Sequence, residues 1–179
     1  MNAQTRSRLM MVICMVLAVV CMMWAMGDVG TTKNGVTAAA RRNSGIADSQ
    51  AVVESRSGKF DAMIFYDPAD PQNGDSRAIV YQDRTGLYGS GINYKFAFGW
   101  HYCTSMDVPE TGVDFYTAEK TGTVIYLSKN AEGIVSAAAP DGTAYTFTTD
   151  RPVVLAGPAG VAFYDESGRA VPCTEAGSF

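Results

Sequence analysis

The stretch Ile92–Cys103, with the sequence INYKFAFGWHYC, carries the clearest strand signal in the chain. Large apolar or aromatic residues alternate here with smaller or polar ones, and the large ones are Ile92, Tyr94, Phe96, Phe98, Trp100 and Tyr102. Because successive residues of a strand lie on opposite faces of a sheet, these six are expected to share one face. Aromatic side chains bury large areas, so this face is predicted to belong to the core. The alternative interpretation is an exposed surface on which the rings of a glycan or a base stack. Its residues would be Tyr94, Phe96, Phe98, Trp100 and Tyr102.

The sequence around this stretch repeats the same pattern from Lys59 onward. Short apolar segments with a period of two are separated by glycine-containing turns such as Asn73-Gly74. The other predicted strands are Phe60–Tyr66, Ala78–Gln82, Val113–Tyr116, Thr123–Ser128, Ile134–Ala138, Ala144–Thr148 and Val161–Tyr164, with Val153–Ala156 as an additional candidate. Strands at such spacing, separated by such turns, are typical of antiparallel sheets. We therefore expect residues 59–179 to form an all-β domain, either an antiparallel sandwich or a barrel.

The N-terminal part contains eighteen consecutive residues without a charge, a proline or a glycine, from Leu9 to Met26. As a helix, this segment is about 27 Å long, close to the roughly 30 Å hydrocarbon core of a bilayer. We interpret residues 9–26 as a transmembrane helix or an uncleaved signal anchor. The alternative is a signal peptide cleaved after Gly27, because Ala25 and Gly27 occupy the −3 and −1 positions of a cleavage site.

The charge distribution predicts the orientation of this helix. All eighteen acidic residues lie at or after Asp28, and residues 28–179 carry twelve basic residues, a net charge of −6. Basic residues flank the helix almost equally, with Arg6 and Arg8 before it and Lys33, Arg41 and Arg42 after it, so the positive-inside rule alone does not select an orientation. Because the acidic residues all follow the helix, the simplest topology makes residues 1–8 a cytoplasmic stub and places the acidic body on the other side of the membrane. The whole chain carries a net charge of −4, which argues against nucleic acid as a partner.

One face of the predicted helix carries small residues. Cys14, Ala18, Cys21 and Ala25 are spaced at i, i+4, i+7 and i+11, which places them on one side of a helix. Small residues let two helices approach closely in lipid, so this face is a candidate helix–helix interface. The alternative is that these alanines and cysteines are ordinary apolar residues of a membrane span.

Residues 27–58 separate the predicted anchor from the β domain. The segment contains no aromatic residue and is rich in Gly, Ala, Ser, Thr, Asn and Arg, a composition that buries little apolar surface. We expect a flexible linker that holds the domain clear of the membrane, with at most a short helix over Ile46–Glu54.

Two of the four cysteines, Cys103 and Cys173, lie in the predicted β domain. In the oxidising compartment that the topology implies, an even pair of cysteines is expected to form a disulfide. Closing this long loop would stabilise the fold by about 4 kcal/mol in the chain-entropy model.

The same part of the chain has a catalytic interpretation. An N-terminal anchor, a β domain, one histidine and a cysteine are similar in layout to the sortase transpeptidases. The resemblance would make Cys173 the nucleophile and His101 the proton carrier, with Arg151 or Arg169 supporting the oxyanion. It covers the layout only, because Ala-Val-Pro precedes Cys173 and no arginine follows it.

A loop between two predicted strands offers oxygen ligands for calcium, and these are Asp67, Asp70, Asn73 and Asp75. The loop lacks the EF-hand spacing, and the same residue types are common in any solvated turn. One histidine and two cysteines are too few for a tetrahedral zinc site, and no glycine-rich phosphate-binding motif is present. We therefore expect no cofactor.

These observations favour a non-catalytic function. We expect a single-pass membrane protein whose extracytoplasmic β domain is an accessory or structural subunit of an envelope or membrane assembly. The expected partners are the lipid bilayer and other membrane or envelope proteins. The first alternative is an anchored or secreted domain that binds a glycan or a peptide, and the second is the cysteine transpeptidase-like enzyme.

Overall fold

The structure is a computed structural model that describes residues 3–25, 29–30, 33–90, 93–97 and 99–179. A long helix, α1 (Ala3–Ala25), is followed by a short one, α2 (Lys33–Ser44), and then mainly by strands in antiparallel and mixed sheets. The prediction of a mostly β body behind one apolar N-terminal helix is confirmed.

The first sheet has five antiparallel strands in the order β1-β7-β4-β3-β2. Its strands are β1 (Val29–Gly30), β2 (Ala51–Ser57), β3 (Phe60–Tyr66), β4 (Ser76–Asp83) and β7 (Trp100–Asp107). The helix α2 packs against one face of this sheet, and the second sheet packs against the other.

Two four-stranded sheets complete the body. The second sheet has the order β12-β9-β8-β15, with β15 parallel to β8. Its strands are β8 (Val113–Thr117), β9 (Val124–Ser128), β12 (Val153–Gly157) and β15 (Cys173–Ser178). The third sheet is antiparallel, in the order β11-β10-β13-β14. Its strands are β10 (Ile134–Ala138), β11 (Ala144–Thr146), β13 (Ala162–Asp165) and β14 (Ala170–Val171).

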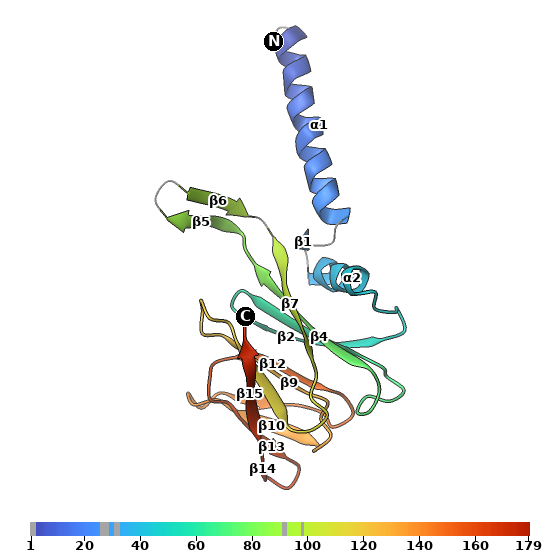
Figure 1. Cartoon of the computed structure of the whole chain (residues 1–179), viewed down its shortest axis with the longest axis vertical. Coiled ribbons are helices and arrows are strands. Elements are labelled where there is room, and N and C mark those ends of the chain that lie inside the picture. Colours follow the sequence, from blue (N-terminus) through green and yellow to red (C-terminus); the bar gives the residue numbers. More distant parts are fainter. Residues whose placement is uncertain (1–2, 26–28, 31–32, 91–92, 98) are drawn as a thin grey trace.

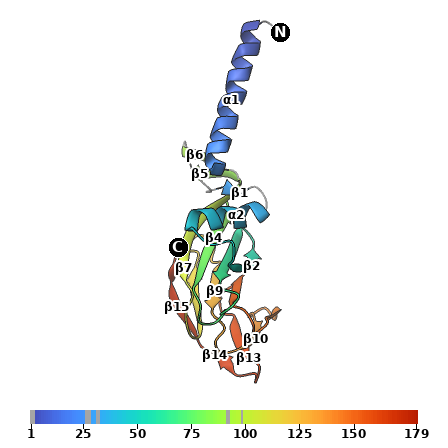
Figure 2. The ribbon, with the colours of Figure 1, turned by 90° about the vertical axis from the view of Figure 1, so that its right-hand side faces the viewer.

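The layers α2, first sheet, second sheet and third sheet follow one another away from α1 (Figures 1 and 2). Alternation along β3 explains how the first sheet is covered on both faces. Ala62 and Ile64 pack in the core that contains Leu127 of the second sheet, whereas Met63 and Phe65 pack against α2. Every residue of β3 is therefore buried, which suits its almost continuous apolar sequence.

The second sheet is also covered on both faces. Ile125 and Leu127 of β9 face the first sheet, while Val124 and Tyr126 pack with third-sheet residues such as Phe163. The second sheet therefore has one apolar core on each side, in addition to the apolar cluster between α2 and the first sheet. None of the described sheets closes into a barrel.

The segment expected to be a flexible linker, residues 27–58, contains α2 and β2 in its described part, so this expectation is corrected. Val36, Ala39 and Ala40 of α2 are fully buried against the first sheet. Their i, i+3, i+4 spacing forms one apolar helical face, although the composition of the segment is that of a linker. The short helix expected over Ile46–Glu54 is not formed, because β2 begins within that range.

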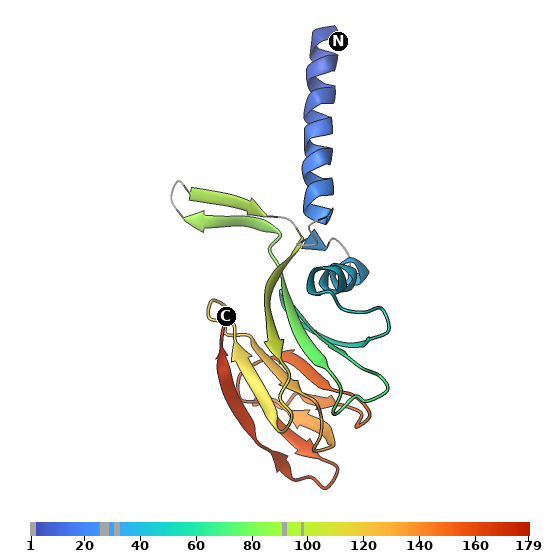
Figure 3. The ribbon, with the colours of Figure 1, turned by 45° about the vertical axis from the view of Figure 1, so that its right-hand side comes forward.

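The predicted strand Ile92–Cys103 is divided between two sheets. In the described part of the chain, β6 (Asn93–Ala97) pairs with β5 (Gly86–Ser90) alone, and β7 belongs to the first sheet. The break includes Gly99, whose φ of 78° lies in the left-handed region that favours glycine. The hairpin of β5 and β6 projects sideways beyond the first sheet (Figures 1 and 3).

The helix α1 extends away from the body (Figure 1). Gln4–Met22 has the length and apolar composition of a membrane span, and none of its residues is buried. These properties fit both a retained span and a signal sequence, the two forms expected from the sequence.

Candidate functional site

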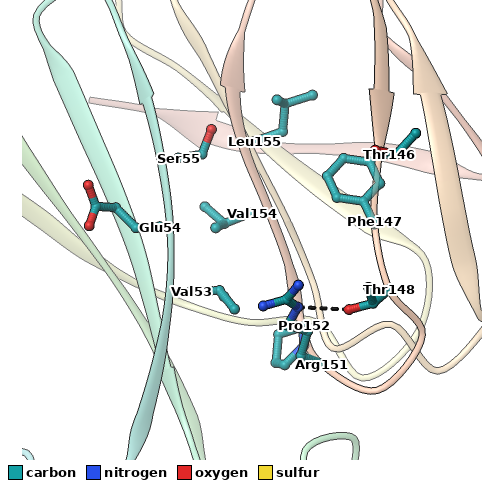
Figure 4. Close-up of a pocket in the computed structure, with 10 residues that line it drawn as sticks. All are labelled: Val53, Glu54, Ser55, Thr146, Phe147, Thr148, Arg151, Pro152, Val154 and Leu155. Carbon is teal, nitrogen blue, oxygen red and sulfur yellow. Dashed lines mark hydrogen bonds between the residues drawn. The ribbon is translucent and has the colours of Figure 1, made fainter.

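An open groove lies where edges of the three sheets converge. β2 is at an edge of the first sheet, β12 of the second and β11 of the third. The groove, of about 290 Å³, is lined by β2, β12 and the segment from β11 to β12. Figure 4 shows Glu54 pointing away from it, whereas Val53 and Ser55 of β2 lie on the side of β12.

Backbone N–H and C=O groups of edge strands border this groove. The inner wall of the groove is the side made by β2 and β12, and it forms where β12 packs on β2 and β3. There the Ala156 N–H donates to Ser55 Oγ at 3.0 Å. In the part of the chain that the structure describes, β2 and β11 each have one strand neighbour. An edge strand carries a row of N–H and C=O groups that its own sheet does not use. The groove therefore lies beside two strand edges with hydrogen-bonding capacity.

The outer wall of the groove is the segment from β11 to β12, and it carries a cation, hydroxyl groups and an aromatic ring. Arg151 is exposed and donates through Nε to Thr148 Oγ1 at 2.7 Å. Phe147 stacks on Phe163, with ring centroids 6.1 Å apart. A guanidinium group beside a hydroxyl suits carboxylate and carbonyl oxygens. Together with the strand edges, these groups suit an extended polar chain such as a peptide.

Asn130 holds the outer wall in place. The residue is fully buried and has a φ of 65°. Its Nδ2 donates to the carbonyl oxygens of Thr148 (3.0 Å) and Arg151 (3.1 Å), and its Oδ1 accepts the N–H of Ile134. Asn130 was not predicted from the sequence. The available signal was an asparagine at the end of an apolar strand and three residues before Gly133, a place where left-handed backbone is common.

A buried carboxylate lies on the α2 side of the first sheet. Asp61 is 1% exposed and forms an ion pair with Arg56. The Arg56 guanidinium also lies 3.8 Å from Glu54 and 4.5 Å above the centre of the Trp100 ring. Burial raises the pKa of the Asp61 carboxyl, with a smaller contribution from the negative charge of Glu54, while Arg56 acts in the opposite direction. This cluster connects β2, β3 and β7.

Asp61→Asn is expected to gain stability relative to the unchanged protein as pH rises. In the unfolded chain the Asp61 carboxyl ionises near its ordinary pKa of 3.8, whereas in the folded protein it ionises at a higher pH. Stability of the unchanged protein therefore falls between these two pKa values and then levels off, and the asparagine variant lacks this loss. Urea unfolding of both proteins from about pH 2 to pH 7 measures the difference, which for Asp61 develops above its unfolded pKa.

Asp83→Asn is the matched control because its difference has the opposite sign. Hydrogen bonds from Thr85 hold the pKa of the Asp83 carboxyl below its usual range. This carboxyl contributes stability above its unfolded pKa, and the contribution is lost as pH falls through the folded value. Parallel curves for Asp61→Asn and Asp83→Asn would contradict the assignment.

The predicted aromatic row is divided between two strands of different sheets, and its first member, Ile92, lies outside the described residues. Tyr94 and Phe96 lie in β6, Trp100 and Tyr102 lie in β7, and Phe98 is outside the described residues. In β7 the Trp100 side chain is half-buried beneath Arg56. The Tyr102 side chain is 40% exposed and meets Tyr81 edge to face. The expectation of one continuous strand is corrected by the break that includes Gly99, whereas the ligand-stacking role of these residues stays a prediction.

The predicted disulfide is not formed, because Cys103 and Cys173 are both free. Cys173 begins β15, whereas Cys103 lines a pocket with Phe179, beyond the other end of that strand. Six residues of extended chain span about 20 Å, whereas a disulfide needs Cα atoms within about 7 Å. Burial raises the pKa of the Cys103 thiol, which favours its neutral form.

The catalytic pair implied by the transpeptidase layout is not assembled either. His101 pairs with Val29 of β1, close to α1, whereas Cys173 pairs with Val113 in the second sheet. Figure 1 shows β15 beginning beside β14, at the end of the body away from α1. The two side chains therefore belong to different layers and to opposite ends of the body.

Two further sets of predicted residues have simple surroundings. Asp67 and Asp70 accept backbone N–H groups of their own turn, from Ala69 (2.9 Å) and Asn73 (3.2 Å). No group of three or more His, Cys, Asp or Glu that could hold a metal ion occurs among the described residues, so the calcium site with Asp75 is not assembled. The candidate interface residues all lie in α1 and are Cys14, Ala18, Cys21 and Ala25. Their role stays a prediction.

No protein-family model, curated protein or solved structure matches this chain.

Proposed function

We propose that the protein is a single-pass membrane protein that displays its acidic β domain on the extracytoplasmic side, as a non-catalytic accessory or structural subunit of an envelope or membrane assembly. The observation that carries the proposal is the exposure of α1. Gln4–Met22 is apolar and wholly unburied, although the body has its own apolar cores. An apolar surface of this size is unfavourable in water and needs lipid or another helix to cover it.

The connection between α1 and the body supports a fixed display. Val29 and Gly30 pair with His101 and Trp100 of the first sheet. Val29 is four residues after Ala25, a distance of at most about 14 Å. The body is therefore held close to the end of α1, which suits a structural subunit better than a long tether does.

We also propose a finer description of the body as a layered sandwich. Its support is the packing of the second sheet between the other two, with a separate apolar core on each side. Face-to-face packing of sheets through alternating apolar residues is the defining feature of sandwiches.

The groove between the three sheet edges is the proposed contact for an assembly partner. An extended segment of the partner would hydrogen-bond to the edges of β2 or β11, and Arg151 would bind its carbonyl or carboxylate oxygens. The test uses full-length protein purified from its own membranes in mild detergent. We expect Arg151→Glu to reduce the co-purifying chain by about tenfold or more, because a buried interfacial charge contact is lost.

Lys120→Glu makes the same charge change at an exposed residue away from the groove. This control is expected to retain the co-purifying chain. Equal loss in both variants, or recovery of the unchanged protein alone, would contradict an assembly contact in the groove.

A second candidate function is the binding of a free glycan or peptide in the same groove. Phe147 and Arg151 beside the Thr148 hydroxyl favour it, since an aromatic ring with polar neighbours is common in ligand sites. Recovery of the protein without a partner chain would favour this second function.

A further inference from the structure

The hairpin of β5 and β6 lies at the level of the C-terminal end of α1. Figures 1, 2 and 3 are turned about one vertical axis, and each places the hairpin beside or just below the last turns of the helix. In the described part of the chain, β5 and β6 pair with each other and with no third strand. A lone two-stranded hairpin is marginally stable in water, so a surface that covers it would stabilise it.

The chain connects the base of this hairpin to the end of α1. β6 ends at Ala97, and three residues later Trp100 pairs with Gly30, next to the Val29–His101 pair. The four steps from Ala25 to Val29 cover at most about 14 Å. If α1 crosses a bilayer, the base of the hairpin is therefore confined to the membrane-proximal end of the molecule.

Hydrogen bonds at its base fix the direction of the hairpin. Thr85 Oγ1 accepts the Gly99 N–H at 2.9 Å, and the Thr85 N–H donates to Asp83 Oδ1 at 2.8 Å. The Arg84 N–H donates to the Gly99 carbonyl at 3.0 Å. These bonds join the two strands of the ribbon where it leaves the first sheet.

The hairpin sequence fits a lipid–water interface. No acidic residue occurs from Arg84 to Met106, in a chain that has eighteen. The register pairs Leu87 with Phe96 and Gly89 with Tyr94, and these pairs alternate along the ladder with the pairs Tyr88–Lys95 and Ser90–Asn93. Successive pairs lie on alternate faces, so Leu87, Tyr94 and Phe96 share one face. Tyrosine and lysine are favoured at the headgroup level of a bilayer.

We propose that this hairpin is a second membrane contact, with the face of Leu87, Tyr94 and Phe96 resting in the interfacial layer of the bilayer that α1 crosses. The inference rests on the proposed membrane anchoring by α1. Two contacts with one bilayer prevent the body from turning freely about α1. The groove is then presented in a constant orientation to its partner.

The test uses the full chain in nanodiscs of phosphatidylcholine and phosphatidylglycerol. A photoreactive benzoylphenylalanine replaces Phe96, Val16 of α1, or Glu166, which lies in the exposed turn between β13 and β14. Mass spectrometry after irradiation counts lipid adducts. We expect adducts at Val16 and at Phe96, with Phe96 about tenfold or more above Glu166, because interfacial residues remain in contact with acyl chains.

The outcomes separate the hairpin contact from the anchor. Adducts at Val16, with Phe96 no higher than Glu166, would overturn the hairpin contact and leave the anchor intact. No lipid adducts at Val16 would overturn the anchor itself. Cross-links from Phe96 to a second copy of the chain in place of lipid would also overturn the contact. The same probe at Leu87 or Ser90, which lie on opposite faces of the ladder, controls for disturbance of the hairpin by the probe itself. Leu87 is expected to give more lipid adducts than Ser90, and equal yields would count against the proposal.

Discussion

Asn130→Ala is expected to lower the free energy of unfolding by roughly 3–5 kcal/mol. The change removes the side-chain bonds to the carbonyl groups of Thr148 and Arg151 and to the N–H of Ile134. These backbone groups then lose partners in a buried site, at about 1 kcal/mol or more each. Alanine is also disfavoured at the left-handed φ of residue 130 by about 1–2 kcal/mol. Urea unfolding of detergent-solubilised protein, followed by tryptophan fluorescence, measures the loss.

Two comparisons separate the causes. Asn130→Gly loses the same hydrogen bonds but tolerates the φ, so it is expected to be about 1 kcal/mol less harmful than alanine. Asn73→Ala removes an exposed bond to Asp70 (3.1 Å) within one turn, and is expected to cost below about 0.5 kcal/mol. If Asn130→Ala and Asn73→Ala had similar effects, Asn130 would not be the residue that holds the groove wall.

Leu17→Arg is expected to shift the membrane insertion of α1 by about a hundredfold. Leu17 lies in the apolar part of α1 and is exposed to whatever surrounds the helix. Replacing leucine with arginine at the centre of a span costs about 3 kcal/mol, and 1.4 kcal/mol corresponds to a factor of ten. The fraction of protein that resists alkaline carbonate extraction measures the effect.

Leu17→Val is the matched control, since valine is also favourable in a bilayer. It is expected to remain in the membrane fraction to the same extent as the unchanged protein. Full retention of Leu17→Arg would show that α1 does not depend on lipid for its position.

The strands that the sequence predicts best are apolar segments that end at turn residues. β3 and β10 have the expected bounds, Phe60–Tyr66 and Ile134–Ala138. Burial on two faces makes β3 nearly continuous in apolar residues, and Gly58 and Gly133 mark turns immediately before the two strands. Local chemistry is sufficient in such segments because burial and turn geometry both act within a few residues.

The elements that were missed depend on contacts with distant parts of the chain. β15 has the polar sequence CTEAGS, is mostly exposed and is held to β8 by backbone pairing, so no periodicity marks it. The face of α2 consists of Val36, Ala39 and Ala40, whose small side chains resemble a linker in composition. In Ile92–Cys103 the alternation continues through Gly99, and the change of sheet depends on bonds to Thr85 and Arg84.

The groove could not be predicted for the same reason. It exists because β2, β11 and β12 are edge strands of three different sheets that stack in one order. Sequence periodicity assigns a residue to a face of its own strand, but not the strand to a layer. Arg151 was singled out from the sequence only as an oxyanion support, whereas the structure places it in the groove wall beside Thr148.

The most direct test of the membrane anchoring is the mass of the mature chain that remains in membranes after an alkaline carbonate wash. A retained span predicts a chain in the membrane pellet whose mass still includes α1, with its β domain open to protease from the extracytoplasmic side. A chain that begins at Asp28 and leaves the membrane with the wash would contradict the anchor, and with it the fixed display of the groove.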